Sequence, residues 1–240
     1  MKKSTICSIL AILVLIPATL YLGTRLPGRW YYLTSTLIII ETMVPFFLAF
    51  ERRKPQAREL VTIAVMAALA AASRAAFAFL PHFKPITAII MITGIAFGAE
   101  AGFLTGAVSA FASNFVFGQG PWTPWQMMAY GIGGFLAGLL FHNRKLSDSP
   151  WLNTALLTVY GFVSIVLVVG PLLDCCTIFT TASELTPAFV GAILASGLPV
   201  NLTHAAACAV TMLLLSRPLL EKLERLKIKY GMMEANPDGL

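Results

Sequence analysis

Polar side chains that could hold a small molecule recur within otherwise apolar stretches of this sequence. Arg74, Asn114, Asn201 and His204 each lie inside a long hydrophobic run. Burying a charge or an amide among apolar groups costs free energy unless a partner or a water-filled cavity receives it. On a helix that begins near Glu59, Arg74 would lie about 22 Å along the axis, towards the far end. The sequence therefore predicts that these side chains converge near one end of a helix bundle.

Aromatic and hydrogen-bonding side chains also gather in the segments that join the runs. The stretch "FLPHFKPI" carries a histidine and a lysine between two prolines, and "FGQGPWTPWQMMAY" holds two tryptophans in a turn that two prolines make rigid. Aromatic walls with a few orienting amides are typical of sites for cofactor-sized ligands, and a rigid turn loses little entropy on binding. An interfacial aromatic belt is the alternative for the tryptophans. The predicted substrate-binding residues are Arg74, His82, Lys84, Asn114, Gln119, Trp122, Trp125, Gln126, Tyr130, Asn201 and His204.

The elements that must position these residues follow from composition. The chain has 240 residues, of which 58% are hydrophobic and 12% charged, more apolar surface than a soluble domain of this size can hide. In hydrocarbon every backbone group needs an internal partner, so continuous apolar runs indicate helices. We predict an all-α polytopic membrane protein with helices near Ile6–Leu22, Trp30–Phe50, Glu59–Phe79, Ile86–Gly98 (short for a full span), Ala101–Phe117, Trp125–Phe141, Leu152–Leu173 and Pro187–Ser216.

Basic residues in the short loops set the orientation. With the N-terminus inside the cell, thirteen lysines and arginines lie in cytoplasmic segments and three lie outside. This bias predicts that both termini are cytoplasmic, and the net charge of +6 needs no nucleic acid to explain it. A cleaved signal peptide is the alternative for the first run, although no clear cleavage site follows it.

The basic segment at residues 51–58 divides the chain. We predict an N-terminal transmembrane hairpin (1–50), a cytoplasmic linker (51–58), a six-helix substrate-binding core (59–217) and a basic cytoplasmic tail (218–240). Glu41 lies within the second helix of the hairpin, where a carboxyl group needs a polar partner or protonation.

The first helix of the core has two rows of alanines at four-residue spacing. Residues i and i+4 share a helix face, and in membranes such small-residue faces let another helix approach closely. Packing within the bundle explains one row equally well. The predicted partner-docking residues are Ala64, Ala67, Ala68, Ala71, Ala72 and Ala75.

Sequence motifs give little support to catalysis. The chain contains no His-Glu-x-x-His, Gly-x-Ser-x-Gly or phosphate-binding Gly-x-x-x-x-Gly-Lys motif, so any ATP hydrolysis must come from partner subunits. We predict no metal site and no permanently bound cofactor. The four cysteines are too scattered for a disulfide framework. An intramembrane enzyme and a structural or assembly protein remain the alternatives from other classes.

The alanine-rich first core helix, the glycine-rich helices after it and the last helix, which opens "GLPVNLTHAAACAV", resemble the substrate-binding S-components of energy-coupling factor (ECF) type vitamin transporters. The resemblance covers about residues 59–217. It implies that the alanine face docks on a transmembrane T-component driven by two ABC ATPases. Many members carry Pro-x-Asn-x-x-Lys in the last helix, and the asparagine and lysine contact the vitamin. Pro199 and Asn201 match that pattern, but His204 replaces the lysine and removes a fixed charge.

The extra N-terminal helices and the "RAAFAFLPHFKP" and "FGQGPWTPWQMM" loops look most like S-components assigned to cobalamin. The resemblance therefore implies a multi-pass protein of the bacterial cell membrane that captures a vitamin, with cobalamin as the expected substrate. Riboflavin or another ring-bearing vitamin is the alternative.

Overall fold

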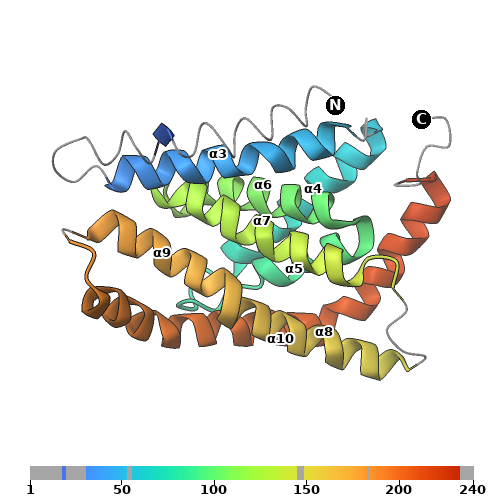
Figure 1. Cartoon of the computed structure of the whole chain (residues 1–240). Coiled ribbons are helices and arrows are strands. Elements are labelled where there is room, and N and C mark those ends of the chain that lie inside the picture. Colours follow the sequence, from blue (N-terminus) through green and yellow to red (C-terminus); the bar gives the residue numbers. More distant parts are fainter. Residues whose placement is uncertain (1–17, 20–30, 53–55, 145–148, 183, 233–240) are drawn as a thin grey trace.

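In the computed structural model the chain is a helix bundle, described for residues 18–19, 31–52, 56–144, 149–182 and 184–232 (Figure 1). Every regular element in these ranges is helical. The elements are α3 (Tyr31–Arg52), α4 (Ala57–Ala76), α5 (Ile86–Phe97), α6 (Ala99–Phe117), α7 (Trp122–Phe141), α8 (Pro150–Ser164), the π-helical segment η2 (Ile165–Val169), α9 (Gly170–Thr181) and α10 (Pro187–Tyr230). Most of the predicted first hairpin helix and the last residues of the predicted tail lie outside the described ranges.

Two helices extend beyond the apolar runs that predicted them. The run that was expected to end at Leu173 continues through η2 and α9 to Thr181. The last helix continues past Ser216 to Tyr230 and ends where Gly231 adopts a left-handed conformation. Polar residues end an apolar run but not necessarily a helix, and beyond Ser216 the Leu, Glu, Lys and Arg residues of α10 are good helix formers. Both predicted ends were therefore too early.

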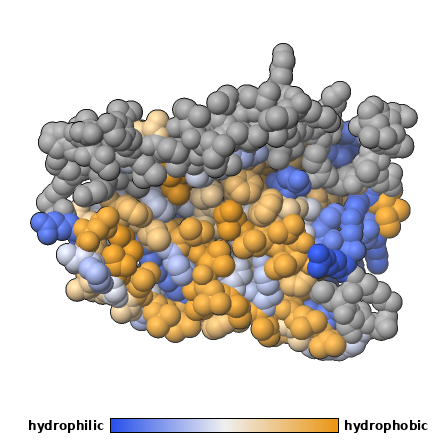
Figure 2. Space-filling view, in the orientation of Figure 1, coloured by the Kyte–Doolittle hydropathy of each residue, from blue (hydrophilic) through white to orange (hydrophobic). Residues whose placement is uncertain are grey.

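The outside of the bundle suits a bilayer. In the described part of the chain, three helical stretches are long and apolar enough to cross a membrane, namely Ala57–Ala76, Pro150–Thr181 and Pro187–Tyr230. In Figure 2 apolar side chains cover the face formed by α8, α9 and α10, and hydrophilic side chains gather at the end where α10 finishes. Exposed apolar surface of this extent marks contact with lipid.

Helix α5 forms the centre of the bundle. All of its twelve residues except Ile95 are buried. At 1.5 Å per residue it is too short to span a bilayer, which confirms the short element expected there. Gly98 has φ of +97° and lets the chain turn directly into α6, a backbone angle that residues with a Cβ rarely adopt. Gly102 and Gly134 bring α6 and α7 into backbone contact beside α5.

The second helix of the N-terminal hairpin, α3, packs on the core. The Phe46 ring stacks on that of Phe103 in α6, with centroids 4.1 Å apart, and Met43 is buried in the same cluster. Glu41 finds the polar partner that its position requires, because Thr19 Oγ1 donates to its Oε1 at 2.7 Å.

Candidate functional site

A cavity of about 550 Å³ opens at the end of the bundle where α4 meets α5 and where α7 begins. We call it the Arg74 cavity. Eight of the eleven predicted binding residues line it, and they come from α4, the segment 77–85, α7 and α10. Its lining residues are Arg74, Pro81, His82, Lys84, Trp122, Gln126, Tyr130, Leu173, Asp174, Cys176, Thr177, Val200, Asn201 and His204. The tertiary structure thus joins side chains that lie up to 130 positions apart, between Arg74 and His204.

A network of hydrogen bonds fixes the Arg74 side chain. Arg74 is 9% exposed, and its Nη1 donates to Ser113 Oγ at 2.6 Å and to Asn114 Oδ1 at 2.8 Å. The guanidinium also lies over the Phe117 ring, 4.5 Å from its centroid. Asn114 Nδ2 in turn donates to Gln126 Oε1 at 2.8 Å. The network holds a positive charge at the cavity wall in one orientation, because each member is already satisfied by the next.

The rigid turn supplies one cavity wall but not with every predicted residue. Trp122 lines the cavity, and its Nε1 donates to Gly118 O at 3.3 Å. Trp125 lies outside it, 5% exposed, and stacks on Phe179 of α9 with ring centroids 5.8 Å apart. Residues three positions apart lie about 60° apart around a helix axis, so the two rings are neighbours on α7, of which Trp122 reaches the cavity and Trp125 packs on α9.

Asn114 and Gln119 also lie outside the cavity lining. Asn114 is fully buried and acts on the cavity through its bonds to Arg74 and Gln126. Gln119 is tied to the turn itself, because its Nε2 donates to Phe111 O and its Oε1 accepts from Thr123 Oγ1. Direct ligand contact by Asn114, Gln119 or Trp125 is therefore not supported by the geometry.

The segment 77–85 covers the cavity with Lys84 and His82. Lys84 Nζ donates to Phe77 O at 2.5 Å and to Leu80 O at 2.8 Å, which closes the segment on itself. Burial, and to a smaller extent the charge of Arg74, lower the pKa of the Lys84 ammonium below its ordinary 10.5. His82 has φ of 58°, which turns the backbone back towards α5.

Two further polar side chains come from the middle of α10. His204 is 7% exposed, its Nε2 lies 3.4 Å from Thr87 Oγ1, and its ring meets the Tyr130 ring edge to face. Asn201 Nδ2 donates to Asp174 Oδ2 at 2.8 Å. Both side chains stand where the sequence expected them, beyond Pro199.

Asp174 is a charged lining residue that the predicted set lacked. The predicted apolar run ends at Leu173, just before it, whereas the structure places Asp174 on α9 in the cavity lining. Gly170, one helical turn before Asp174, was the available signal, since small residues in membrane helices mark places where another helix approaches closely.

The two alanine rows of α4 differ in exposure. Ala64, Ala68 and Ala72 are exposed, together with Val61 and Val65, which are 62% and 60% exposed. Ala67 is 1% exposed and packs inside the bundle, and Ala71 and Ala75 are half-buried. The inner row therefore serves packing, as one row was expected to do, and Ala67 cannot lie on a docking surface.

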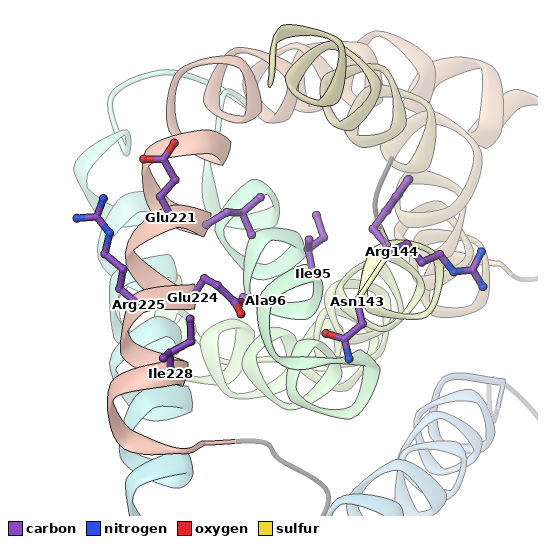
Figure 3. A pocket seen from close by; sticks show the side chains of 10 residues that line it. Ile95, Ala96, Asn143, Arg144, Glu221, Glu224, Arg225 and Ile228 are labelled. Atoms are coloured by element: carbon purple, nitrogen blue, oxygen red, sulfur yellow. The ribbon is translucent and has the colours of Figure 1, made fainter. Parts of the chain in front are cut away.

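A second cavity of about 580 Å³ lies at the opposite end of the bundle, between the ends of α5 and α7 and the last turns of α10 (Figure 3). We call it the Arg225 cavity. Its floor is apolar, and its charged residues are Arg144, Glu221, Glu224 and Arg225. The guanidinium groups of Arg144 and Arg225 point away from the space between the helices in Figure 3. Glu221 pairs with Arg217 at 3.0 Å and Glu224 with Lys227 at 3.9 Å.

A helix bundle with a lipid-facing exterior and a polar, ring-lined cavity at one end defines a membrane protein that binds a small molecule. Residues 54–221 match the family model described as "ECF-type riboflavin transporter, S component". Since the match covers more than half of the chain, the protein belongs to this family of membrane transporter subunits, which are not enzymes. The comparisons with curated proteins and with solved structures find no match.

Proposed function

We propose that this chain is the substrate-binding subunit of an ECF-type importer and that it captures riboflavin in the Arg74 cavity. The observation that carries the proposal is the cavity itself, whose volume of about 550 Å³ falls in the range of pockets that enclose drug-sized molecules. The family to which the chain belongs is named for riboflavin transport. The tricyclic ring of riboflavin would pack between Trp122 and Tyr130.

The same volume speaks against cobalamin, the substrate expected from the subgroup resemblance. A corrin with its amide side chains and nucleotide loop has several times as many atoms as riboflavin. The family model does not name cobalamin either. Capture of cobalamin would therefore require the cavity walls to move apart.

The polar groups of the cavity suit a neutral ligand with many hydrogen-bonding atoms. Arg74 supplies donors from one side, and Asp174 and Asn201 lie on the other. The carbonyl groups of a flavin ring and the hydroxyl groups of its ribityl chain could satisfy both kinds of partner.

Transport would require partner subunits in the bacterial cell membrane. We propose that a T-component docks on the exposed row Ala64, Ala68 and Ala72, because a smooth face lets another helix approach closely. Two ABC ATPases would supply the energy. The basic residues at the Arg225 end would place that end in the cytoplasm and open the Arg74 cavity to the outside.

Calorimetric titration of the purified chain tests the substrate. We expect tight, one-to-one binding of riboflavin and no heat from cobalamin. Tight binding of cobalamin alone would overturn the assignment to riboflavin, and a folded chain that binds neither vitamin would contradict the proposed function.

Uptake by cells that express the complete transporter tests the docking face. Ala68→Leu with Ala72→Leu should abolish riboflavin uptake and leave binding to the purified chain unchanged. Val159→Leu, on the exposed face of α8, is the matched control and should leave both unchanged. Normal uptake by the double variant would remove the docking assignment.

A further inference from the structure

Helices α9 and α10 meet through a reciprocal pair of glycines and polar side chains. Gly170 and Asp174 lie four residues apart on α9, and Gly197 and Asn201 lie four residues apart on α10. A methyl group at Gly170 would lie 2.5 Å from Asn201 Cγ, and one at Gly197 would collide with the Asp174 carboxylate. Each helix therefore carries a glycine where the other inserts its polar side chain, and we call the four residues the α9–α10 clasp.

The clasp fixes the orientation of the Asn201 amide relative to Asp174. An ionised carboxylate only accepts hydrogen bonds, so the amide must turn its Nδ2 towards Asp174, as the 2.8 Å bond shows. The oxygen, Oδ1, is then left on the other side. Within the described part of the chain, neither Asn201 Oδ1 nor Asp174 Oδ1 accepts a hydrogen bond from a protein donor. Both residues line the Arg74 cavity.

The clasp gives the cavity two chemically different walls. On the side of α4, the guanidinium of Arg74 carries only donors, whereas the three N–H groups of Lys84 are taken up by backbone carbonyls of the segment 77–85. On the side of α9 and α10, the clasp leaves two acceptor oxygens, Asn201 Oδ1 and Asp174 Oδ1, and a single donor, the second N–H of Asn201 Nδ2. A ligand edge that carries acceptors can form hydrogen bonds at the α4 wall, and an edge that carries N–H or O–H groups can form them at the α9–α10 wall.

We propose that Asp174 is a positioning residue that holds the Asn201 amide with its oxygen towards the cavity, so that the α9–α10 wall selects a ligand edge bearing N–H or O–H donors. The inference rests on the proposed function, because it concerns how the same cavity selects its ligand. It assigns no ligand contact to Asp174 itself. The effect reaches the ligand through Asn201.

Three flavins test the inference with the purified full-length chain. Riboflavin carries an imide N–H and ribityl hydroxyl groups, its N3-methyl derivative lacks the imide donor, and lumiflavin lacks the hydroxyl groups. We expect the wild-type chain to bind riboflavin at least about tenfold more tightly than one of the two analogues, because a buried acceptor that loses its donor is costly.

Asp174→Asn should reduce that ratio to about threefold or less, because an amide at 174 can turn a donor to the cavity and let Asn201 reverse. The double variant Asp174→Asn with Asn201→Asp should restore the ratio, since the amide at 174 then donates to the carboxylate at 201 and acceptors again face the ligand. Gly170→Ala should act like Asp174→Asn, because it displaces Asn201. Gly191→Ala, with no heavy atom near the added methyl group, is the matched control.

If Asp174 had a purely structural role, its substitution would lower the melting temperature and weaken the binding of all three flavins equally. Unchanged affinity ratios in Asp174→Asn would therefore overturn the inference. Equal binding of all three flavins by the wild type would also overturn it. A wild-type chain that binds no flavin would instead remove the proposed function and the inference together, which makes the two failures distinguishable.

Discussion

The two ends of the bundle carry cavities of similar volume but opposite construction. In the Arg74 cavity, Arg74, Asn201 and His204 are each less than 10% exposed, and protein partners hold each of them in place. In the Arg225 cavity, Glu221 and Glu224 pair with neighbours one helical turn away, and the guanidinium groups of Arg144 and Arg225 point outwards.

The difference shows that volume does not identify a binding site. Side chains that are already ordered lose little entropy when a ligand arrives, whereas exposed arginines must be ordered and desolvated first. Exposed pairs such as Arg217 with Glu221 also contribute little to stability. The side chains of the Arg74 cavity are thus preorganised, and those of the Arg225 cavity are not.

The largest contrast is expected between the two arginines that name the cavities. Arg74→Met should weaken riboflavin binding about a hundredfold, because it also leaves Ser113 and Asn114 without their donor. Arg225→Met, at the opposite end, should leave the affinity within about twofold. Calorimetry measures both, and melting curves without ligand show whether the Arg74 variant remains folded. Equal losses at both ends would break the comparison.

Tryptophan substitutions sharpen the contrast by spectroscopy. Trp122→Ala should weaken riboflavin binding about tenfold, since it removes an aromatic wall. In the Trp122→Phe variant, riboflavin should quench protein fluorescence less than in the wild type. Trp151 is 76% exposed at the start of α8, and Trp151→Phe should leave both the affinity and the fractional quenching by the ligand nearly unchanged. Quenching that depends on Trp151 would place the ligand at the wrong end.

Two glutamines of the same turn give a finer test within the Arg74 end. Gln126→Ala should weaken binding about fivefold, because it removes a cavity side chain and the acceptor of Asn114 Nδ2. Gln119→Ala should change the affinity less than about twofold, because Gln119 is bonded within the turn. A larger loss in Gln119→Ala would mean that the turn, and not the cavity lining, controls the affinity.

The smallest effect is expected from the titration of Lys84. Its pKa is lower in the folded chain than its ordinary 10.5, because burial, and then Arg74, disfavour the charged form. Between the two pKa values the unfolded chain binds more protons, so the contribution of this group to stability rises with pH across that window. The melting temperature of the wild type should therefore rise slightly relative to that of Lys84→Met as the pH approaches 10.5 from below. A fall in the melting temperature of the wild type relative to Lys84→Met over the same pH range would contradict the lowered pKa.

The sequence predicted most of the fold because its signals are local. Apolar runs located α3 to α7 to within a few residues, and the buried α5 was recognised as short. The ends of α9 and α10 were misplaced, because hydropathy falls at Asp174 and after Ser216 while the helices continue. Hydropathy indicates which residues suit contact with lipid, whereas helix propensity indicates whether the backbone can remain helical.

The candidate site was predicted in its composition and only partly in its geometry. Polar groups within apolar runs are costly, so Arg74, Asn201 and His204 could be singled out without knowing their neighbours. Which of Trp122 and Trp125 faces the cavity could not be known, because the answer depends on how α7 is rotated against α9. The pairing of Asp174 with Asn201 could not be predicted either, because it depends on how α9 packs against α10.

The sequence by itself determined that this is a helical membrane protein, that one end of it is basic, and that its polar residues within apolar runs need partners. These properties follow from transfer free energies, which are summed residue by residue along the chain. The tertiary structure alone decided which alanine row of α4 faces outwards, which tryptophan lines the cavity and which way the Asn201 amide points. Each of these depends on contacts between helices that are distant in sequence, because a side chain's surroundings are set by the helix packed against it.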